Sequence, residues 1–194
     1  MARKRSGGTP ATVALDRAGV DYTLRPYDHD PRAASRSLRR SRSDRLEGYG
    51  TEAAAALGVD PARVFKTLLA SLDGRLVVGI VPVSGRLDLK ALARALGGSK
   101  AVMADVAAAE RATGYVAGGI SPMGQKRPHP TVLDRSALDH ATILVSGGRR
   151  GLDVELAPAD LVAITGAIVD QVRAQPGRRA ATAWGEEVEG PGLP

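Results

Sequence analysis

The sequence predicts an α+β domain built on a mixed, mainly antiparallel β-sheet. Two apolar, β-branched runs at residues 66–72 and 75–82 flank Asp73-Gly74, a dipeptide that strongly indicates a hairpin. Helical patterns with capping residues lie on both sides of this hairpin, and strands and helices neither alternate regularly nor repeat. The chain has 194 residues, of which 43% are apolar, so we expect one domain with appendages.

The N-terminal part predicts a helix followed by a strand. Thr9 is a hydroxyl N-cap, Pro10 suits the first helical position, and Gly19 suits the end of the helix. A strand is expected at residues 20–27. Residues 1–8 are expected to form a flexible basic tail before the domain, which we place at residues 9–173.

The middle of the chain predicts helices on both sides of the hairpin. Helical patterns occur at residues 51–57, and Asp60 before Pro61 predicts a short capped turn, after which Lys66 opens a strand. Two helices are expected after the hairpin. They run from the cap Asp88 through Leu96 and from the cap Asp105 through Arg111, and they end at Gly97-Gly98 and near Gly114.

The C-terminal part begins with a long loop. Residues 115–131 are rich in Gly and Pro, and a loop of this length usually has a functional reason. Short strands and one apolar helix are expected to complete the domain. The strands are placed at residues 131–134, 141–146 and 152–156, the helix at 158–172, and a disordered tail at 174–194.

The formal charge of +6 is concentrated in two short segments. Residues 1–8 hold three cationic side chains, and residues 32–47 hold six arginines against two acidic residues, so the rest of the chain is close to neutral. The second segment lacks apolar periodicity, and we expect it to be a poorly ordered insertion. Such basic segments suit weak attraction of phosphates at the rim of a site.

Composition excludes several classes of function. Without cysteine there is no thiolate nucleophile and no cysteine metal site, and three scattered histidines do not indicate zinc. Aromatic residues make up 3%, too few for a protein that binds nucleic acid by base stacking alone. No stretch approaches 18 apolar residues, and the basic N-terminus has no apolar signal core, so we expect a soluble, cytoplasmic protein.

Lys66 is the first candidate for chemistry. It stands in Val-Phe-Lys-Thr-Leu-Leu, where few polar neighbours are available, and a partly desolvated lysine stabilises an anion or acts as a base. The alternative is a lysine at the end of a strand whose aliphatic part is buried and whose amine reaches solvent. The local sequence leaves both interpretations open.

The second candidate is the loop from Gly118 to Gly124. Its glycines allow the backbone amides to turn toward an oxyanion or a phosphate. It is not a Walker loop, because Gln125 separates Gly124 from the lysine, Pro122 interrupts the cradle, and no helix can start afterwards. A structural turn without a ligand is the alternative interpretation.

Three further side chains are candidates for lining a pocket. Ser146 and Asp153 flank a tight connection between two strands, and Tyr27 lies at the end of the strand predicted at 20–27. A catalytic triad is not indicated, because a nucleophile elbow is missing and no histidine has an evident pairing. A plain hairpin turn and a residue at the rim of a pocket are the alternative interpretations.

Taken together and in order, these segments resemble the YbaK family, the free-standing relatives of the editing domain inserted in bacterial prolyl-tRNA synthetases. The resemblance spans residues 9 to about 173. It is carried by Thr9-Pro10-Ala11, Tyr27-x-His29-Asp30, Phe65-Lys66-Thr67-Leu68-Leu69, Gly85-x-Leu87-Asp88-Leu89-Lys90, Thr113-Gly114-Tyr115-x-x-Gly118-Gly119-Ile120-Ser121-Pro122-x-Gly124-Gln125-Lys126 and Ser146-Gly147-Gly148-x-Arg150-Gly151-Leu152-Asp153.

The resemblance implies a barrel-like core surrounded by helices, and hydrolysis of the ester between a wrong amino acid and tRNA, most characteristically cysteine on tRNA(Pro). It implies Lys66, Gly118 and Pro122 as catalytic residues. It implies Tyr27, Ser146 and Asp153 as substrate-binding residues, with no metal and no cofactor. The expected partners are mischarged tRNA and, as a further candidate, prolyl-tRNA synthetase, but neither a membrane nor DNA.

The resemblance leaves substrate and activity open at two points. Sister families remove alanine and other small amino acids, and a module that binds tRNA or a synthetase without turnover would keep the same fold. The arginine-rich segment at 32–47 and the tails depart from the family pattern. We expect this segment to attract tRNA non-specifically, and a solvated loop without a function is the alternative.

Overall fold

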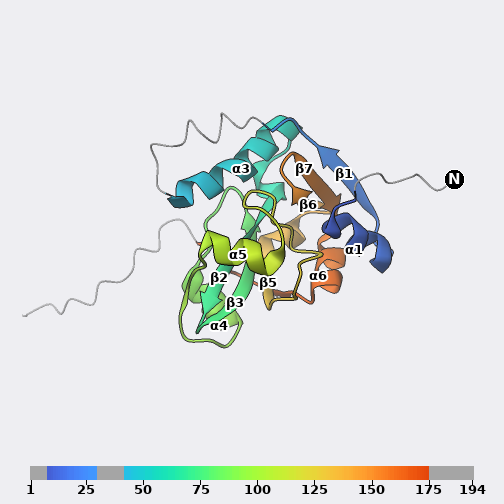
Figure 1. The fold of residues 1–194 in the computed structure, drawn as a ribbon. Coiled ribbons are helices and arrows are strands. Elements are labelled where there is room, and N and C mark those ends of the chain that lie inside the picture. The colour runs from blue at the N-terminus through green and yellow to red at the C-terminus, as the bar shows by residue number, and fades with distance from the viewer. Residues whose placement is uncertain (1–7, 30–41, 175–194) are drawn as a thin grey trace, which may run out of the picture.

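The computed structural model describes residues 8–29 and 42–174, with only the backbone described for 42–48. In this part of the chain, eight strands form one sheet in the order β1-β7-β6-β2-β3-β5-β8, and β4 pairs with β2 beside that path (Figure 1). The strands are β1 (Tyr22–Pro26), β2 (Val64–Leu72), β3 (Arg75–Pro82), β4 (Ala101–Met103), β5 (Thr131–Asp134), β6 (Ile143–Arg149), β7 (Leu152–Leu156) and β8 (Ile168–Asp170).

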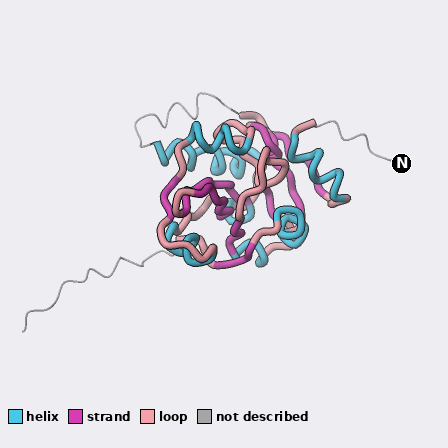
Figure 2. The backbone as a smooth tube through the Cα atoms, turned by 60° about the horizontal axis from the view of Figure 1, so that its bottom comes forward, coloured by secondary structure: helices cyan, strands magenta, loops and turns pink. Residues whose placement is uncertain are grey.

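The sheet is mixed and mainly antiparallel, as the sequence predicts. β1 with β7, β7 with β6, β2 with β3 and β2 with β4 are antiparallel pairs. β2 with β6, β3 with β5 and β5 with β8 are parallel pairs. The sheet curves into a half-barrel, and Figure 2 shows the helices placed around the strands.

Helices cover the sheet with small and branched apolar side chains. Ala54 of α3 packs with Val64, Val83 and Leu144, while α4 contributes to a second cluster and α1, α5 and α6 contribute to the largest one. None of the helices in the described part of the chain is long and apolar enough to span a membrane. The helices are α1 (Pro10–Ala18), α3 (Arg42–Leu57), α4 (Leu89–Ala95), α5 (Val106–Thr113) and α6 (Pro158–Thr165), with 3-10 turns at Pro61–Arg63 and Arg135–Asp139.

The predicted caps and the hairpin are confirmed. The Thr9 hydroxyl accepts a hydrogen bond from the Thr12 backbone N–H at 3.2 Å. Gly19 ends α1 with φ of 65°. The turn between β2 and β3 places Asp73 and Gly74 at positive φ, 49° and 89°, which is the conformation that this dipeptide favours.

The expectation of an irregular insertion at 32–47 is wrong for its last six residues. Residues 42–47 belong to the first turns of α3, whereas 32–41 lie outside the described residues. Arginine, leucine and glutamate are good helix formers, and no proline interrupts the chain between residue 42 and the predicted helix at 51–57. The helix therefore extends toward the N-terminus without an apolar stripe of its own.

Strand pairing changes the prediction in three other places. The helix expected at 158–172 ends at Thr165, because Gly166 adopts φ of 64° and its N–H bonds back to the Val162 carbonyl. Residues 168–170 then form β8 against β5. β4 was not predicted, and β6 begins at residue 143 and continues through residue 149. Of the tails expected at 1–8 and 174–194, residues 1–7 and 175–194 lie outside the described residues, whereas the Ala174 N–H donates to the Arg86 carbonyl at 2.8 Å.

Candidate active site

A cavity lies where strand β2 has a neighbour on one side only. β2 pairs with β6 at Val64 and Phe65 and with β4 at residues 70–72, so the described residues leave 66–68 paired to β3 alone. The cavity has a volume of about 100 Å³, well above the roughly 10–15 Å³ that one water molecule needs. Its walls are formed by β2, by α3, by α5 and by the loop after α5.

Three of the predicted side chains reach this cavity from neighbouring strands. β2 and β6 run parallel with Phe65 opposite Val145, so Lys66 and Ser146 are the next positions on the two strands. Ser146 in turn is paired with Asp153 of β7. Residues in such register have side chains on the same face of a sheet. Strand register alone thus places Lys66, Ser146 and Asp153 on one face of the sheet, and all three line the cavity.

Burial changes the acidity of Asp153. Its side chain is 5% exposed, and desolvation raises the pKa of its carboxyl from 3.8 to about 7. No described residue forms a hydrogen bond or an ion pair with this carboxyl that would offset its burial. The site therefore holds an acid that titrates close to neutral pH, instead of a permanently charged carboxylate.

Tyr27 lies beside Asp153 and completes the polar part of the cavity. It follows β1, and its backbone N–H donates to the Gly151 carbonyl at 3.1 Å. Desolvation, and then the charge of Asp153, raise the pKa of its phenol to about 12. The phenol consequently stays protonated at physiological pH, as a donor within the cavity.

The glycine loop forms the opposite wall. Gly118 has φ of 83°, and a Cβ atom at this position would lie 2.9 Å from the ring of Tyr49 on α3. Gly118 and Ile120 line the cavity, whereas the Gly119 N–H donates to the Val116 carbonyl at 2.9 Å and closes a turn. The backbone N–H groups of Gly118 and Ile120 have no partner among the described residues, so alternate amides, not successive ones, are available to a ligand.

Pro122 belongs to the same loop but does not line the cavity. It is buried, between Ser121 and Met123, which are 0% and 2% exposed. The Tyr115 hydroxyl donates to the Met123 carbonyl at 2.7 Å. Pro122 is therefore a buried residue of a loop that the Tyr115 hydrogen bond anchors next to it.

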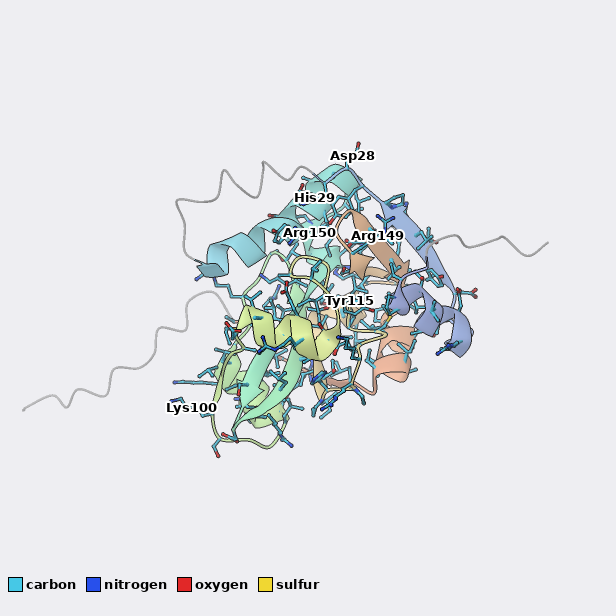
Figure 3. All side chains as sticks on the ribbon, in the orientation of Figure 1. Asp28, His29, Lys100, Tyr115, Arg149 and Arg150 are labelled. Carbon is cyan, nitrogen blue, oxygen red and sulfur yellow. The ribbon has the colours of Figure 1, made fainter. Side chains whose placement is uncertain are left out.

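An aromatic and cationic rim surrounds the Gly118 side of the cavity. The Arg150 guanidinium lies 4.9 Å from the centre of the Tyr49 ring and donates to the Ala117 carbonyl at 2.7 and 3.0 Å. The His29 ring lies 5.7 Å from the same Tyr49 ring. Figure 3 shows His29 and Arg150 at one end of the molecule and Lys100 at the other. Neighbouring positive charge suits a ligand that carries phosphate.

The structure brings together five of the six predicted site residues: Tyr27, Lys66, Gly118, Ser146 and Asp153. Sequence reasoning missed Tyr49 and Thr67, which also line the cavity. Tyr49 falls between the arginine-rich segment and the helical pattern at 51–57, so it carried no local signal. Thr67 stood inside an apolar run, where a threonine is an ordinary strand residue.

The remaining lining is apolar, and it limits the chemistry. Ala53, Val83, Val106 and Ala109 are among the side chains that enclose the cavity. Among the described residues, no histidine lines the cavity, and the Ser146 hydroxyl accepts only a weak hydrogen bond, from the Gly148 N–H at 3.3 Å. A serine without a base is a poor nucleophile. The arrangement suits binding and polarising a group that is already reactive.

Comparisons with known proteins find relatives both in sequence and in fold. A model of the aminoacyl-tRNA editing domain matches residues 49–164, more than half of the chain. An Enterococcus faecalis protein named "Putative Cys-tRNA(Pro)/Cys-tRNA(Cys) deacylase EbsC" is 41% identical over 114 residues, which are 58% of this chain and 69% of that protein.

Two solved structures share the fold. One is described as "a putative trans-editing enzyme for prolyl tRNA synthetase"; it has a TM-score of 0.69 at 24% identity and covers 88% of this chain and 100% of its own. The other is described as a hypothetical protein; it has a TM-score of 0.70 at 24% identity and covers 86% of this chain and 100% of its own. Both confirm the mixed-sheet fold with surrounding helices.

Proposed function

The chain belongs to the aminoacyl-tRNA editing domain family, and from this premise we propose that it hydrolyses mischarged aminoacyl-tRNA, most characteristically Cys-tRNA(Pro). One observation carries the proposal. Lys66, Ser146 and Asp153 meet Gly118 and Tyr27 in a single cavity, although they come from segments far apart in the chain. A deacylase of this kind acts in trans, on tRNA that a synthetase has released.

The substrate explains why the cavity lacks a nucleophile paired with a base. An aminoacyl ester is already activated, and its attacker is water, a ribose hydroxyl or the thiol of the cysteine itself. The protein's task is to fix the ester and to stabilise the negative charge that develops on its carbonyl oxygen. Attack by the cysteine thiol would release a cyclic product instead of free cysteine.

Lys66 supplies the charge in this scheme. Lys66 is mostly shielded from solvent and lies beside apolar walls. In such surroundings its ammonium group interacts more strongly with a developing anion than it would in water. The N–H groups of Gly118 and Ile120, which have no partner in the described part of the chain, bind the terminal ribose or the carbonyl from the opposite wall. Tyr27, Ser146 and Asp153 bind polar groups of the terminal nucleotide or of the amino acid.

Mischarged tRNA is the partner that this site requires. Arg150 at the rim is exposed and placed to contact phosphates near the 3′ end, while the rest of the described surface holds charges of both signs. Prolyl-tRNA synthetase is a further proposed partner that would select the tRNA. A cytoplasmic location follows from the same proposal, because charged tRNA is made and used there.

The decisive experiment presents the purified protein with tRNA(Pro) charged with cysteine, alanine or proline. We expect fast loss of the cysteinyl ester with the wild type and a loss of activity of about 100-fold or more in Lys66→Ala, as for the removal of a major electrostatic group. Lys100→Ala is the matched control, because Lys100 is exposed and lies at the far end of the molecule (Figure 3).

The comparison of these variants decides the proposal. If Cys-tRNA(Pro) survives equally long with the wild type, with Lys66→Ala and without protein, the chain is not a deacylase of this substrate. Faster hydrolysis of Ala-tRNA(Pro) than of Cys-tRNA(Pro) would assign the chain to the alanine-removing deacylases of the same family.

A further inference from the structure

The strongest unexplained feature of the cavity is Thr67. Its hydroxyl is the buried side-chain group that has no hydrogen-bond partner among the described residues. Leaving such a group unpaired costs free energy, so an exception in a folded protein indicates a bound water, an ion or a ligand. Thr67 lines the cavity, directly after Lys66.

Among the described residues, the backbone N–H and carbonyl of Thr67 also have no strand partner. The Val64 carbonyl accepts from the Val83 N–H of the chain beyond β3, and the Leu69 carbonyl accepts from the Ala104 N–H after β4. Backbone groups in a strand alternate in direction, so Phe65, Thr67 and Leu69 direct theirs away from β3. The backbone of Phe65 pairs with β6, and the Leu69 carbonyl accepts from the Ala104 N–H. Neither strand reaches Thr67.

A one-residue gap in the sheet therefore faces the cavity with three polar groups. They are the N–H, the carbonyl and the hydroxyl of Thr67. The N–H and the carbonyl of one residue in a strand present a donor and an acceptor side by side, which is the pattern that a residue of an antiparallel neighbour normally completes. A ligand with an acceptor and a donor on adjacent carbons fits the same gap.

We propose that the open edge of β2 binds the aminoacyl group of the substrate as if it were one residue of a neighbouring strand. The α-ammonium group donates to the Thr67 carbonyl, and the ester carbonyl accepts from the Thr67 N–H. This is strand addition reduced to a single residue. The inference rests on the proposed function and adds to it the part of the site that recognises an amino acid as such.

The pairing also places the side chain of the substrate. Paired residues of two strands have their side chains on the same face, so the substrate side chain lies beside the Thr67 hydroxyl. Phe65 and Leu69, which share this face of β2 with Thr67, pack in one cluster with Ala109 and Ile120. The face lies opposite that of Lys66. The hydroxyl can donate to a thiol but not to a methyl group, which makes Thr67 a specificity-determining residue for cysteine over alanine.

The first test changes the hydroxyl alone. Thr67→Val should lower kcat/KM about tenfold for Cys-tRNA(Pro), and it should not lower kcat/KM for Ala-tRNA(Pro), because alanine offers nothing to the hydroxyl. Its Tm should stay unchanged or rise, since no bond within the fold is lost. Thr67→Ser should keep the preference for cysteine.

Thr131→Val is the matched control for this substitution. Thr131 is 6% exposed, and its hydroxyl donates to the His129 carbonyl at 2.8 Å, so the same change removes a satisfied bond outside the cavity. The control should lower the Tm and leave the ratio of the two kcat/KM values as in the wild type. A Thr67→Val variant with an unchanged ratio overturns the specificity role.

The second test addresses the backbone pairing. tRNA(Pro) esterified with 3-mercaptopropionate keeps the thiol and the ester but lacks the α-amino group, and wild-type kcat/KM should fall about 10- to 100-fold because the Thr67 carbonyl stays unpaired. Adenosine carrying cysteine through an amide bond at its 3′ position reports binding without turnover. Its Kd should rise about tenfold when the amino group is removed.

Failure of the pairing at Thr67 can be distinguished from failure of the proposed deacylase function. If wild type hydrolyses Cys-tRNA(Pro) and handles the 3-mercaptopropionyl ester equally well, the pairing at Thr67 is overturned and the deacylase function stands. If wild type binds the amide-linked cysteinyl-adenosine but hydrolyses no ester, the proposed function fails, and an equal Kd with and without the amino group would overturn the pairing as well.

Discussion

The neutral substitution Asp153→Asn should make the protein more stable and less active at alkaline pH. Asp153 is buried at the cavity, and burial raises the pKa of its carboxyl from 3.8 to about 7 in the folded state. Between these two values the folded protein holds a proton that the unfolded chain releases. The free energy of unfolding therefore falls as the pH rises through this window, and the decrease is complete above pH 7.

The size of the effect follows from the shift. About three pKa units at roughly 1.4 kcal/mol each give about 4 kcal/mol at pH 8 as an upper bound, because water entering the cavity lowers the cost of the charge. Asparagine has nearly the same shape and carries no charge at any pH. The free energy of unfolding of the variant should equal that of the wild type near pH 4 and should exceed it by a growing amount up to pH 8.

Glu155, on the same strand, provides a control in which the pKa shift and the pH dependence of stability have the opposite sign. Its carboxylate accepts from the Thr142 hydroxyl at 2.6 Å, and this bond, followed by those with Arg25, lowers the pKa of the carboxyl. The stabilisation is present above pH 4.5, the ordinary pKa of the group, and is lost as the pH falls through the lowered value. Glu155→Gln should therefore be less stable than wild type at pH 8, and the difference should vanish in acid.

Urea unfolding followed by far-UV circular dichroism at a series of pH values measures these differences. Deacylation of Cys-tRNA(Pro) at pH 8 is measured in parallel, and Asp153→Asn should lose at least tenfold in kcat/KM if the carboxylate binds the substrate. If this variant is no more stable than wild type at pH 8, the Asp153 carboxylate is solvated or paired, and the account of a buried unpaired acid is wrong.

Two further predictions concern the glycine loop. Gly118→Ala and Gly114→Ala both place an alanine at positive φ, 83° and 80°, and each should lose about 1 kcal/mol of unfolding free energy. Only Gly118→Ala meets the ring of Tyr49, whereas Gly114→Ala meets a flexible side chain, so only the former should lose deacylation; equal activities would contradict the assigned wall. Tyr115→Phe removes the hydrogen bond to Met123 and should cost about 1–2 kcal/mol in urea unfolding, with a few-fold loss of kcat/KM; unchanged values for both would show that the loop does not depend on it.

Local signals predicted most of the elements because the groups that decide them are close in sequence. Thr9, Asp88 and Asp105 accept hydrogen bonds from backbone N–H groups two or three residues ahead. Asp73-Gly74 sets the β2–β3 turn through its own backbone angles. These features require no knowledge of the rest of the fold.

The secondary-structure predictions failed where pairing with a distant strand determines the element. β8 forms because α6 ends at Gly166 and the following residues pair with β5, where Ile168 lies opposite Val132. β4 is three residues long, and only its pairing with β2 makes it a strand. No periodicity can be read from so few residues.

For the candidate site, the sequence by itself determined which residue types are present and excluded thiolate chemistry, and the order of motifs indicated the family. Tertiary structure decided that Lys66, Ser146 and Asp153 share a face, that Pro122 is buried away from the cavity, and that burial raises the pKa of Asp153 to about 7. It also decided the open edge at Thr67. That edge exists because, among the described residues, β6 pairs only with the start of β2 and β4 only with its end. The local sequence of β2 does not indicate the positions at which these distant strands stop pairing.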